Sequence, residues 1–185
     1  MRIKYNAPTV LTYALLSALV MAITLYLLPS LREWFMVPGR GHFLPLNVQC
    51  WLSLFTHVIG HSGWPHLVSN FAIILLVGPM LEENYGSLAL LVMIIITALV
   101  TGILNVLFFP LSLFGASGVV FMMILLASFT NFSHGEIPLT FILVLTLYIG
   151  NQLLQSFDKS NISYFAHIAG GFCGSLFGFF ISPKH

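Results

Sequence analysis

The sequence predicts an all-α membrane protein, a six-transmembrane-helix bundle with an interfacial loop between the first two helices. Of its 185 residues, 58% are hydrophobic and only 6% are charged. A soluble domain carries about 25% charged residues, so this chain cannot cover itself with a hydrated surface. Its outer solvent is therefore expected to be lipid. Six separate apolar segments give the number of helices, and we expect residues 1–185 to form a single membrane domain.

The apolar segments are expected to be helices because every backbone amide in hydrocarbon must be paired internally. The fourth segment has about 14 residues, whereas a full span needs about 20. We therefore expect it to begin below the membrane surface, in a cavity that other helices line. The six segments are Val10–Leu28, His66–Leu81, Ser87–Phe109, Ser117–Thr130, Ile137–Leu154 and Tyr164–Ile181.

The connection from Pro29 to Trp64 is much longer than the others. It contains two arginines, several aromatic residues and an amphipathic section near residues 51–57, so we expect it to lie partly in the membrane interface. The six Lys and Arg residues fall three on each side of the membrane, and the positive-inside rule does not decide the orientation. Arg2 and Lys4, just before the first segment, favour a cytoplasmic N-terminus.

Other partner classes find little support in the composition. The formal net charge is +1 and no basic cluster exists, so nucleic acid is excluded as a partner. Cys50 and Cys173 lie in different environments and form neither a disulfide framework nor a metal site. We expect both to be structural, and we expect neither a metal nor another cofactor.

A hydroxyl opens the short fourth segment, in the stretch LFGASGVVFM. Ser117 stands there between small residues, with Gly115 and Gly118 on either side of the Ala116–Ser117 pair. Polar groups inside an apolar chain are functional candidates because burying them in lipid is costly.

An imidazole in the sixth segment can reach this hydroxyl if the two helices pack through their glycines. A lone histidine in a span can also simply hydrogen-bond to a neighbour, and the glycine spacing alone is common. His167 is followed by Gly170 and Gly174 at i+3 and i+7, so the three share one helical face and let another helix approach closely. A neutral imidazole can take the proton of a serine hydroxyl. The chain has five acidic residues, all at segment ends or in loops, such as Asp158. The sequence therefore predicts a Ser117–His167 dyad rather than a triad.

Hydrogen-bond donors for an oxyanion lie in the stretch HVIGHSGWPHLVSN. His66 and Asn70 are spaced i, i+4, so both lie on one face at the start of the second segment. The backbone N–H of Ser117, at a helix N-terminus, is a third donor. Glycosylation sequons and other short patterns add nothing specific.

Together these motifs resemble those of the rhomboid intramembrane serine proteases, in the family's order and on the second, fourth and sixth spans. The resemblance covers the chain from about Phe55 to the C-terminus. It implies that Ser117 is the nucleophile and His167 the general base. It also implies that the site is supported by further residues. These are His66 and Asn70 in the oxyanion hole, with His57 and His61 as nearby structural or hydration residues. Glu82 and Gly86, in the stretch EENYG, also resemble the family's pattern at the end of the second span.

Two positions depart from the family's pattern. Leu52 and Ser53 stand where many bacterial members carry Trp-Arg, which affects the anchoring of the first loop and not the chemistry. Phe121 stands where many members carry a tyrosine beneath the catalytic histidine. A phenyl ring can still stack on the imidazole, but it cannot provide the hydroxyl.

The resemblance also implies a water-filled cavity that opens to the extracytoplasmic side of a bacterial inner membrane. Substrates would be transmembrane helices of single-span membrane proteins, entering laterally near the second and fifth spans. Asn151 and Gln152 on the fifth span either line this entrance or pair with backbone and headgroups. The physiological substrate and the oligomeric state stay open.

Three other function classes were weighed. His57 and His61 have the spacing of a metalloprotease pair, but Val58 stands where the glutamate of that motif belongs. A small transporter or channel would explain scattered polar residues, but not the paired Ser–Gly and His–Gly motifs. An inactive rhomboid-like binding protein would lack the serine or the histidine, and both are present.

Overall fold

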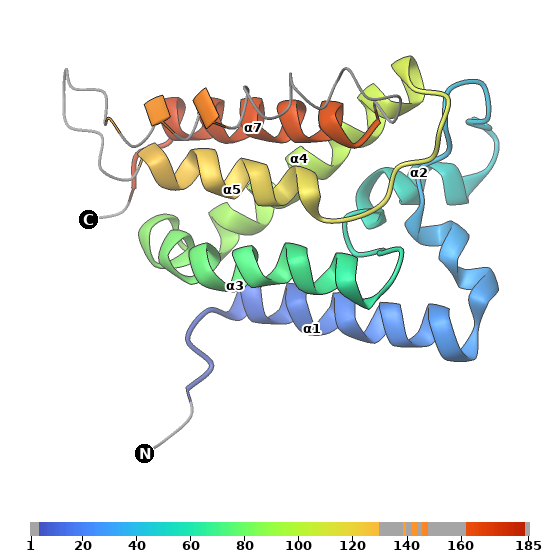
Figure 1. Cartoon of the computed structure of the whole chain (residues 1–185), viewed down its shortest axis with the longest axis horizontal. Coiled ribbons are helices and arrows are strands. Elements are labelled where there is room, and N and C mark those ends of the chain that lie inside the picture. Colours follow the sequence, from blue (N-terminus) through green and yellow to red (C-terminus); the bar gives the residue numbers. More distant parts are fainter. Residues whose placement is uncertain (1–3, 130–138, 140–141, 144–145, 148–161, 184–185) are drawn as a thin grey trace.

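The computed structural model describes residues 4–129 and 162–183, together with 139, 142–143 and 146–147 (Figure 1). Within these ranges the regular structure is helical, apart from an isolated β-bridge between Val37 and Leu113. The predicted all-α fold class is confirmed. The elements are α1 (Pro8–Ala22), η1 (Ile23–Leu27), η2 (Pro29–Phe35), α2 (Val48–Thr56), α3 (Trp64–Tyr85), α4 (Ser87–Phe108), α5 (Ser117–Phe129) and α7 (Ile162–Phe180).

Three of the described helices are long and apolar enough to cross a membrane. They are α1 with the π-helical η1 (Pro8–Leu27), then α3 and α4. α5 has 13 residues, as short as the sequence predicts, and α7 has 19. The fifth predicted segment, with Asn151 and Gln152, lies almost wholly outside the described residues.

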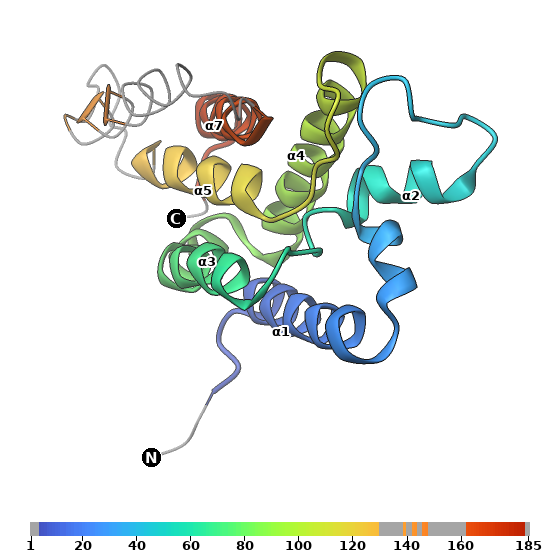
Figure 2. The same cartoon turned by 45° about the vertical axis from the view of Figure 1, so that its right-hand side comes forward.

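α5 lies at the centre of the bundle, packed against α7 on one side and near α3 and α4 on the other (Figure 2). A helix that is apolar on all sides must be covered on all sides. This is the case for α5, since most of its side chains are buried. Its fully buried large residues are Met122, Met123, Leu125 and Leu126.

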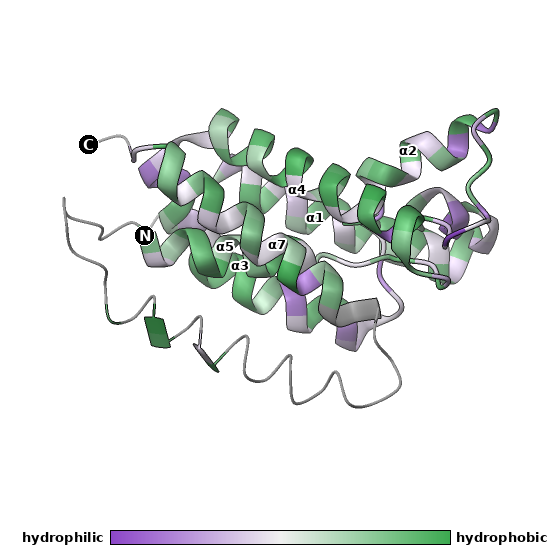
Figure 3. Ribbon diagram, turned by 90° about the horizontal axis from the view of Figure 1, so that it is seen from above, coloured by the Kyte–Doolittle hydropathy of each residue, from purple (hydrophilic) through white to green (hydrophobic). Residues whose placement is uncertain are grey.

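The outer faces of α1, α3 and α4 carry large exposed apolar side chains. In Figure 3 hydrophobic residues cover most of the length of these helices. Such a surface is suited to lipid and not to water. The long connection contains η2 and α2, and Leu46, Val48 and Trp51 project from it with more than half of their surface exposed. These side chains fit the interfacial location that the sequence predicts.

The N-terminus of α1 is capped by a different helix. α1 begins at Pro8, and no neighbouring side chain caps it. Instead, the carboxylate of Glu82 near the end of α3 accepts hydrogen bonds from the backbone N–H groups of Thr9 and Val10, at 2.8 and 3.0 Å. The Thr9 hydroxyl donates to the carbonyl of Ser87 at the start of α4. The Glu82 carboxylate thus joins α3 to α1 and stabilises the positive end of the α1 dipole, while Thr9 joins α1 to α4.

We expect Glu82→Gln to destabilise the protein by about 1–3 kcal/mol, because charge-assisted hydrogen bonds contribute that much. The measurement is the midpoint of thermal unfolding in detergent, which should fall by several degrees. Glu83→Gln is the matched control, since Glu83 is exposed and should leave the midpoint unchanged. Equal effects of the two substitutions would contradict this role for Glu82.

Candidate functional site

Ser117 is the first residue of α5 and is half-buried. The chain reaches it through Gly115, whose φ of +117° lies in a region that side chains rarely adopt. A Cβ at this position would lie 2.6 Å from Cε1 and 2.9 Å from Nε2 of His66. Gly115 is therefore needed for its backbone conformation and for its close approach to the imidazole. As a result, the start of α5 lies directly against His66 from α3.

The segment before Ser117 is fixed by hydrogen bonds from its backbone. The N–H of Gly115 donates to the carbonyl of His57 at 2.9 Å. The N–H of Ala116 donates to Nε2 of His61 at 3.4 Å. A loop at membrane depth must have its amides paired within the protein, and these two histidines supply the acceptors.

The earlier part of the same loop is held by the long connection and by α4. Leu113 and Val37 exchange both backbone hydrogen bonds, at 2.9 and 3.0 Å. The side-chain amide of Asn105, near the end of α4, donates to the carbonyl of Leu111 at 3.1 Å. The guanidinium of Arg32 lies 5.2 Å from the centre of the Phe114 ring, a cation–π contact.

Both ring nitrogens of His57 and of His61 are engaged within the protein. Nδ1 of His57 donates to the carbonyl of Ser53 at 3.1 Å, and its Nε2 lies 3.3 Å from the hydroxyl oxygen of Thr101, which donates to the carbonyl of Thr97 at 2.8 Å. Nδ1 of His61 donates to the carbonyl of Ile59 at 3.1 Å, which leaves Nε2 as the acceptor for Ala116. The bond from the N–H of Ala116 requires a neutral His61 ring. Burial agrees with this, because it lowers the pKa of each ring to about 4.

The spacing of these two histidines does not place them on one helix face. α2 ends at Thr56, and His57 is its C-cap residue, so His61 follows in the turn before α3. Their nitrogens point to separate partners and do not converge on a common point. The geometry therefore fits support of the Ser117 loop rather than a metal pair.

α5 and α7 are in backbone contact. A Cβ on Gly170 would collide with the carbonyl oxygen of Gly118, and one on Gly174 would collide with the carbonyl oxygen of Met122. Gly178 continues the same four-residue spacing and lies against the ring of Phe129. We did not single out Gly178 from the sequence, although its spacing could have revealed it. Small residues at this spacing let two helices pack closely.

This packing places His167 over the N-terminal half of α5. Its ring lies 4.4 Å, centre to centre, from the ring of Phe121, with 40° between the planes. Ser117 is one turn before Phe121, so both lie on the same face of α5. The imidazole of His167 therefore lies against the face of α5 that carries Ser117, and that of His66 lies against Gly115 just before this helix.

Hydrogen-bond donors line the α3 side of the site. The hydroxyl of Ser62 lies 3.0 Å from Nδ1 of His66, a contact that sequence reasoning missed although the spacing is i, i+4. One turn after His66, the side chain of Asn70 is 7% exposed. Its Nδ2 has no hydrogen-bond partner among the described residues. A buried donor without a partner is costly, and it can stabilise a negative charge that develops beside it.

Comparison with known proteins identifies relatives across most of the chain. The model of the Rhomboid domain family matches residues 48–184. Putative rhomboid protease YdcA of Bacillus subtilis is 30% identical over 140 residues, which cover 72% of this chain and 69% of that protein. Rhomboid protease GlpG of Haemophilus influenzae is 25% identical over 67% of this chain and 66% of that protein. Rhomboid-like protein 11 of Arabidopsis thaliana, a chloroplast protein, is 22% identical, and the match spans 60% of its length.

Acid should destabilise the protein through His57 and His61. In the unfolded chain their pKa is about 6.5, whereas in the folded protein it is about 4. Between these values the unfolded state binds more protons, so stability is lost as the pH falls from 7 toward 4. At pH 5 we expect each ring to have lowered the free energy of unfolding by roughly 2 kcal/mol. The measurement is the midpoint of thermal unfolding across this pH range, which should fall with the pH.

The variant His61→Gln keeps an acceptor for Ala116 but takes up no proton, so its midpoint should depend less steeply on pH. His42→Gln is the control, because His42 is exposed and its replacement should leave the slope unchanged. If His61→Gln had the wild-type slope, His61 would not be the group that titrates.

Proposed function

Since the chain belongs to the rhomboid family, we propose that this integral membrane protein is a serine endopeptidase that uses a Ser117–His167 dyad. The main support is the backbone contact between α5 and α7. Gly118 follows the hydroxyl directly, and Gly170 lies one turn after the imidazole. The contact between these two glycines holds together the parts of α5 and α7 that carry the reacting groups.

His167 acts as the general base. A neutral imidazole accepts the proton of Ser117 as the hydroxyl attacks a peptide carbonyl, and it then gives that proton to the leaving amine. A triad uses a carboxylate to orient the imidazole. Here the ring of Phe121 packs against the imidazole and restricts its rotation.

The oxyanion is stabilised from α3 and from the start of α5. Asn70 contributes its Nδ2, which has no partner in the described part of the chain, and Ser117 contributes its backbone N–H, which lies at a helix N-terminus. If the Ser62 hydroxyl donates to Nδ1 of His66, then Nε2 of that ring carries the hydrogen and is the third donor.

The substrates are transmembrane helices of single-span proteins. α5 is too short to span the membrane, so its first residue lies below the surface, at the depth of a substrate helix. A helical substrate must unwind locally to present a carbonyl, and helix-breaking residues lower that cost. We place the N-terminus in the cytoplasm and the protein in the plasma membrane of a bacterium.

The dyad can be tested with the full chain, purified in detergent and incubated with a single-span substrate. Ser117→Ala and His167→Ala should each abolish cleavage, whereas a metal chelator should have no effect. A fluorophosphonate should label the wild type at Ser117. Ser128→Ala is the control, since Ser128 lies on the same helix and donates to the carbonyl of Ile124. Cleavage by Ser117→Ala at the wild-type rate would refute the mechanism.

Replacement of Asn70 by alanine tests the oxyanion hole. Loss of one such donor lowers kcat by about 100- to 1,000-fold, and KM should change little because the interaction forms mainly in the transition state. Ser69→Ala is the neighbouring control, because Ser69 is exposed and donates to the carbonyl of His66. A change in KM alone would assign Asn70 to substrate binding instead.

A further inference from the structure

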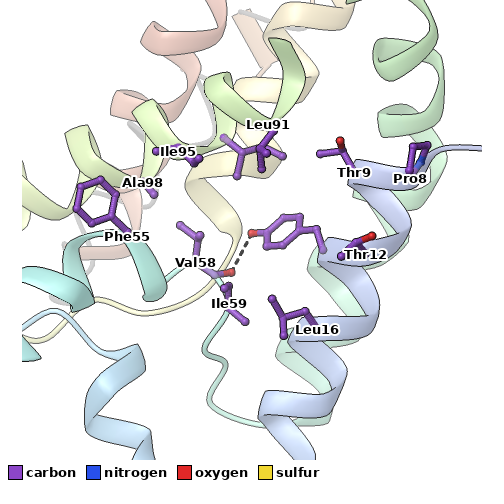
Figure 4. A pocket seen from close by; sticks show the side chains of 12 residues that line it. Pro8, Thr9, Thr12, Leu16, Phe55, Val58, Ile59, Leu91, Ile95 and Ala98 are labelled. Carbon is purple, nitrogen blue, oxygen red and sulfur yellow. Dashed lines mark hydrogen bonds between the residues drawn. The ribbon is translucent and has the colours of Figure 1, made fainter. Parts of the chain in front are cut away.

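An apolar cavity of about 390 Å³ lies between α1 and α4, away from the candidate active site (Figure 4). Its volume is within the range of small-molecule pockets, about 300–1,000 Å³. Pro8 and Thr9 lie at one end, and Phe55 lies at the other. Nothing in the proposed proteolytic mechanism uses this cavity.

Two helices supply most of the cavity wall. The α1 wall is formed by residues 8–9, 12–13 and 16, spaced at successive turns, so it is one stripe about 12 Å long. The facing wall is formed by Leu91, Ile94, Ile95 and Ala98 of α4, at i, i+3, i+4 and i+7. Both helices are candidate membrane spans, and a hydrocarbon chain in a bilayer lies in the same general direction as such helices.

Every hydroxyl in the cavity wall already has a partner. Tyr13 donates to the carbonyl of Val58 at 2.9 Å, the dashed line in Figure 4. Thr9 donates to a backbone carbonyl of α4, and Thr12 is hydrogen-bonded to the hydroxyl of Tyr5. Water in a buried site needs two to four polar partners, and the lining, which is mostly apolar, offers few. An apolar occupant is therefore favoured.

The cavity opens toward the lipid-facing surface. Leu16, Phe55, Leu91 and Ile95 line it and are each 40–43% exposed. From these observations we propose that the cavity binds one acyl chain of a bilayer phospholipid. The occupant lies between α1 and α4 and contacts Val58, whose neighbour His57 holds the Ser117 loop through Gly115.

The test uses the full chain in vesicles of phosphatidylethanolamine, a fraction of which carries a photoreactive diazirine on one acyl chain. After irradiation, mass spectrometry locates the adducts. Tyr13, Val58 and Ile94 are each at most 8% exposed, so a chain inside the cavity reaches them and the surrounding lipid does not. Val92 and Ile96 are exposed on the same helix as Ile94, so adducts on them show labelling by the surrounding lipid.

We expect adducts on the three buried residues in the wild type and their loss in Ile95→Trp, whose larger side chain fills the opening. Ile96→Trp is the matched control, with the same substitution one position along and a similar exposure. It should keep the adducts on the buried residues. Adducts confined to Val92 and Ile96 in the wild type would overturn the proposal, whether or not either variant folds. The proposal would also be overturned if folded Ile95→Trp protein still formed adducts on the three buried residues.

Discussion

The contact between the backbones of α5 and α7 is the constraint on which the candidate site depends. In lipid, two helices gain no hydrophobic driving force by associating, so they are held by close packing. Gly170 and Gly174 remove the side chains that would keep α7 away from the carbonyls of Gly118 and Met122. The distance between the helices is therefore set by their main chains, and with it the position of His167 over the face that carries Ser117.

Polar side chains in this apolar protein serve two different purposes. The side chains of His57, His61 and Tyr13 form hydrogen bonds with backbone groups of the protein. They hold in place a loop that lipid could not solvate. Asn70 is different, because its buried amide keeps a donor without a partner among the described residues. A side chain with a free donor of this kind is available for a ligand, whereas a side chain whose polar atoms are hydrogen-bonded within the protein supports the fold.

Local spacing predicted those features that depend on one helix. The shortness of α5 follows from the length of its apolar segment. The alignment of the α7 glycines, and the location of His66 and Asn70 on one face of α3, follow from the period of a helix. Features that join distant segments could not be read in this way. The cap that Glu82 provides for Thr9 and Val10, and the support of Ala116 by His61 across 55 positions, depend on how helices are placed relative to one another. Periodicity within each segment carries no information on that placement.

The capping of α1 by Glu82 has a consequence for biogenesis. The acceptor lies 72 and 73 positions after the amides that it binds, so α1 leaves the ribosome long before its cap has been translated. The first turn of α1 acquires its final hydrogen bonds only when α3 has entered the bilayer beside it. α1 is therefore translated before α3, but its first turn becomes ordered only after α3 arrives.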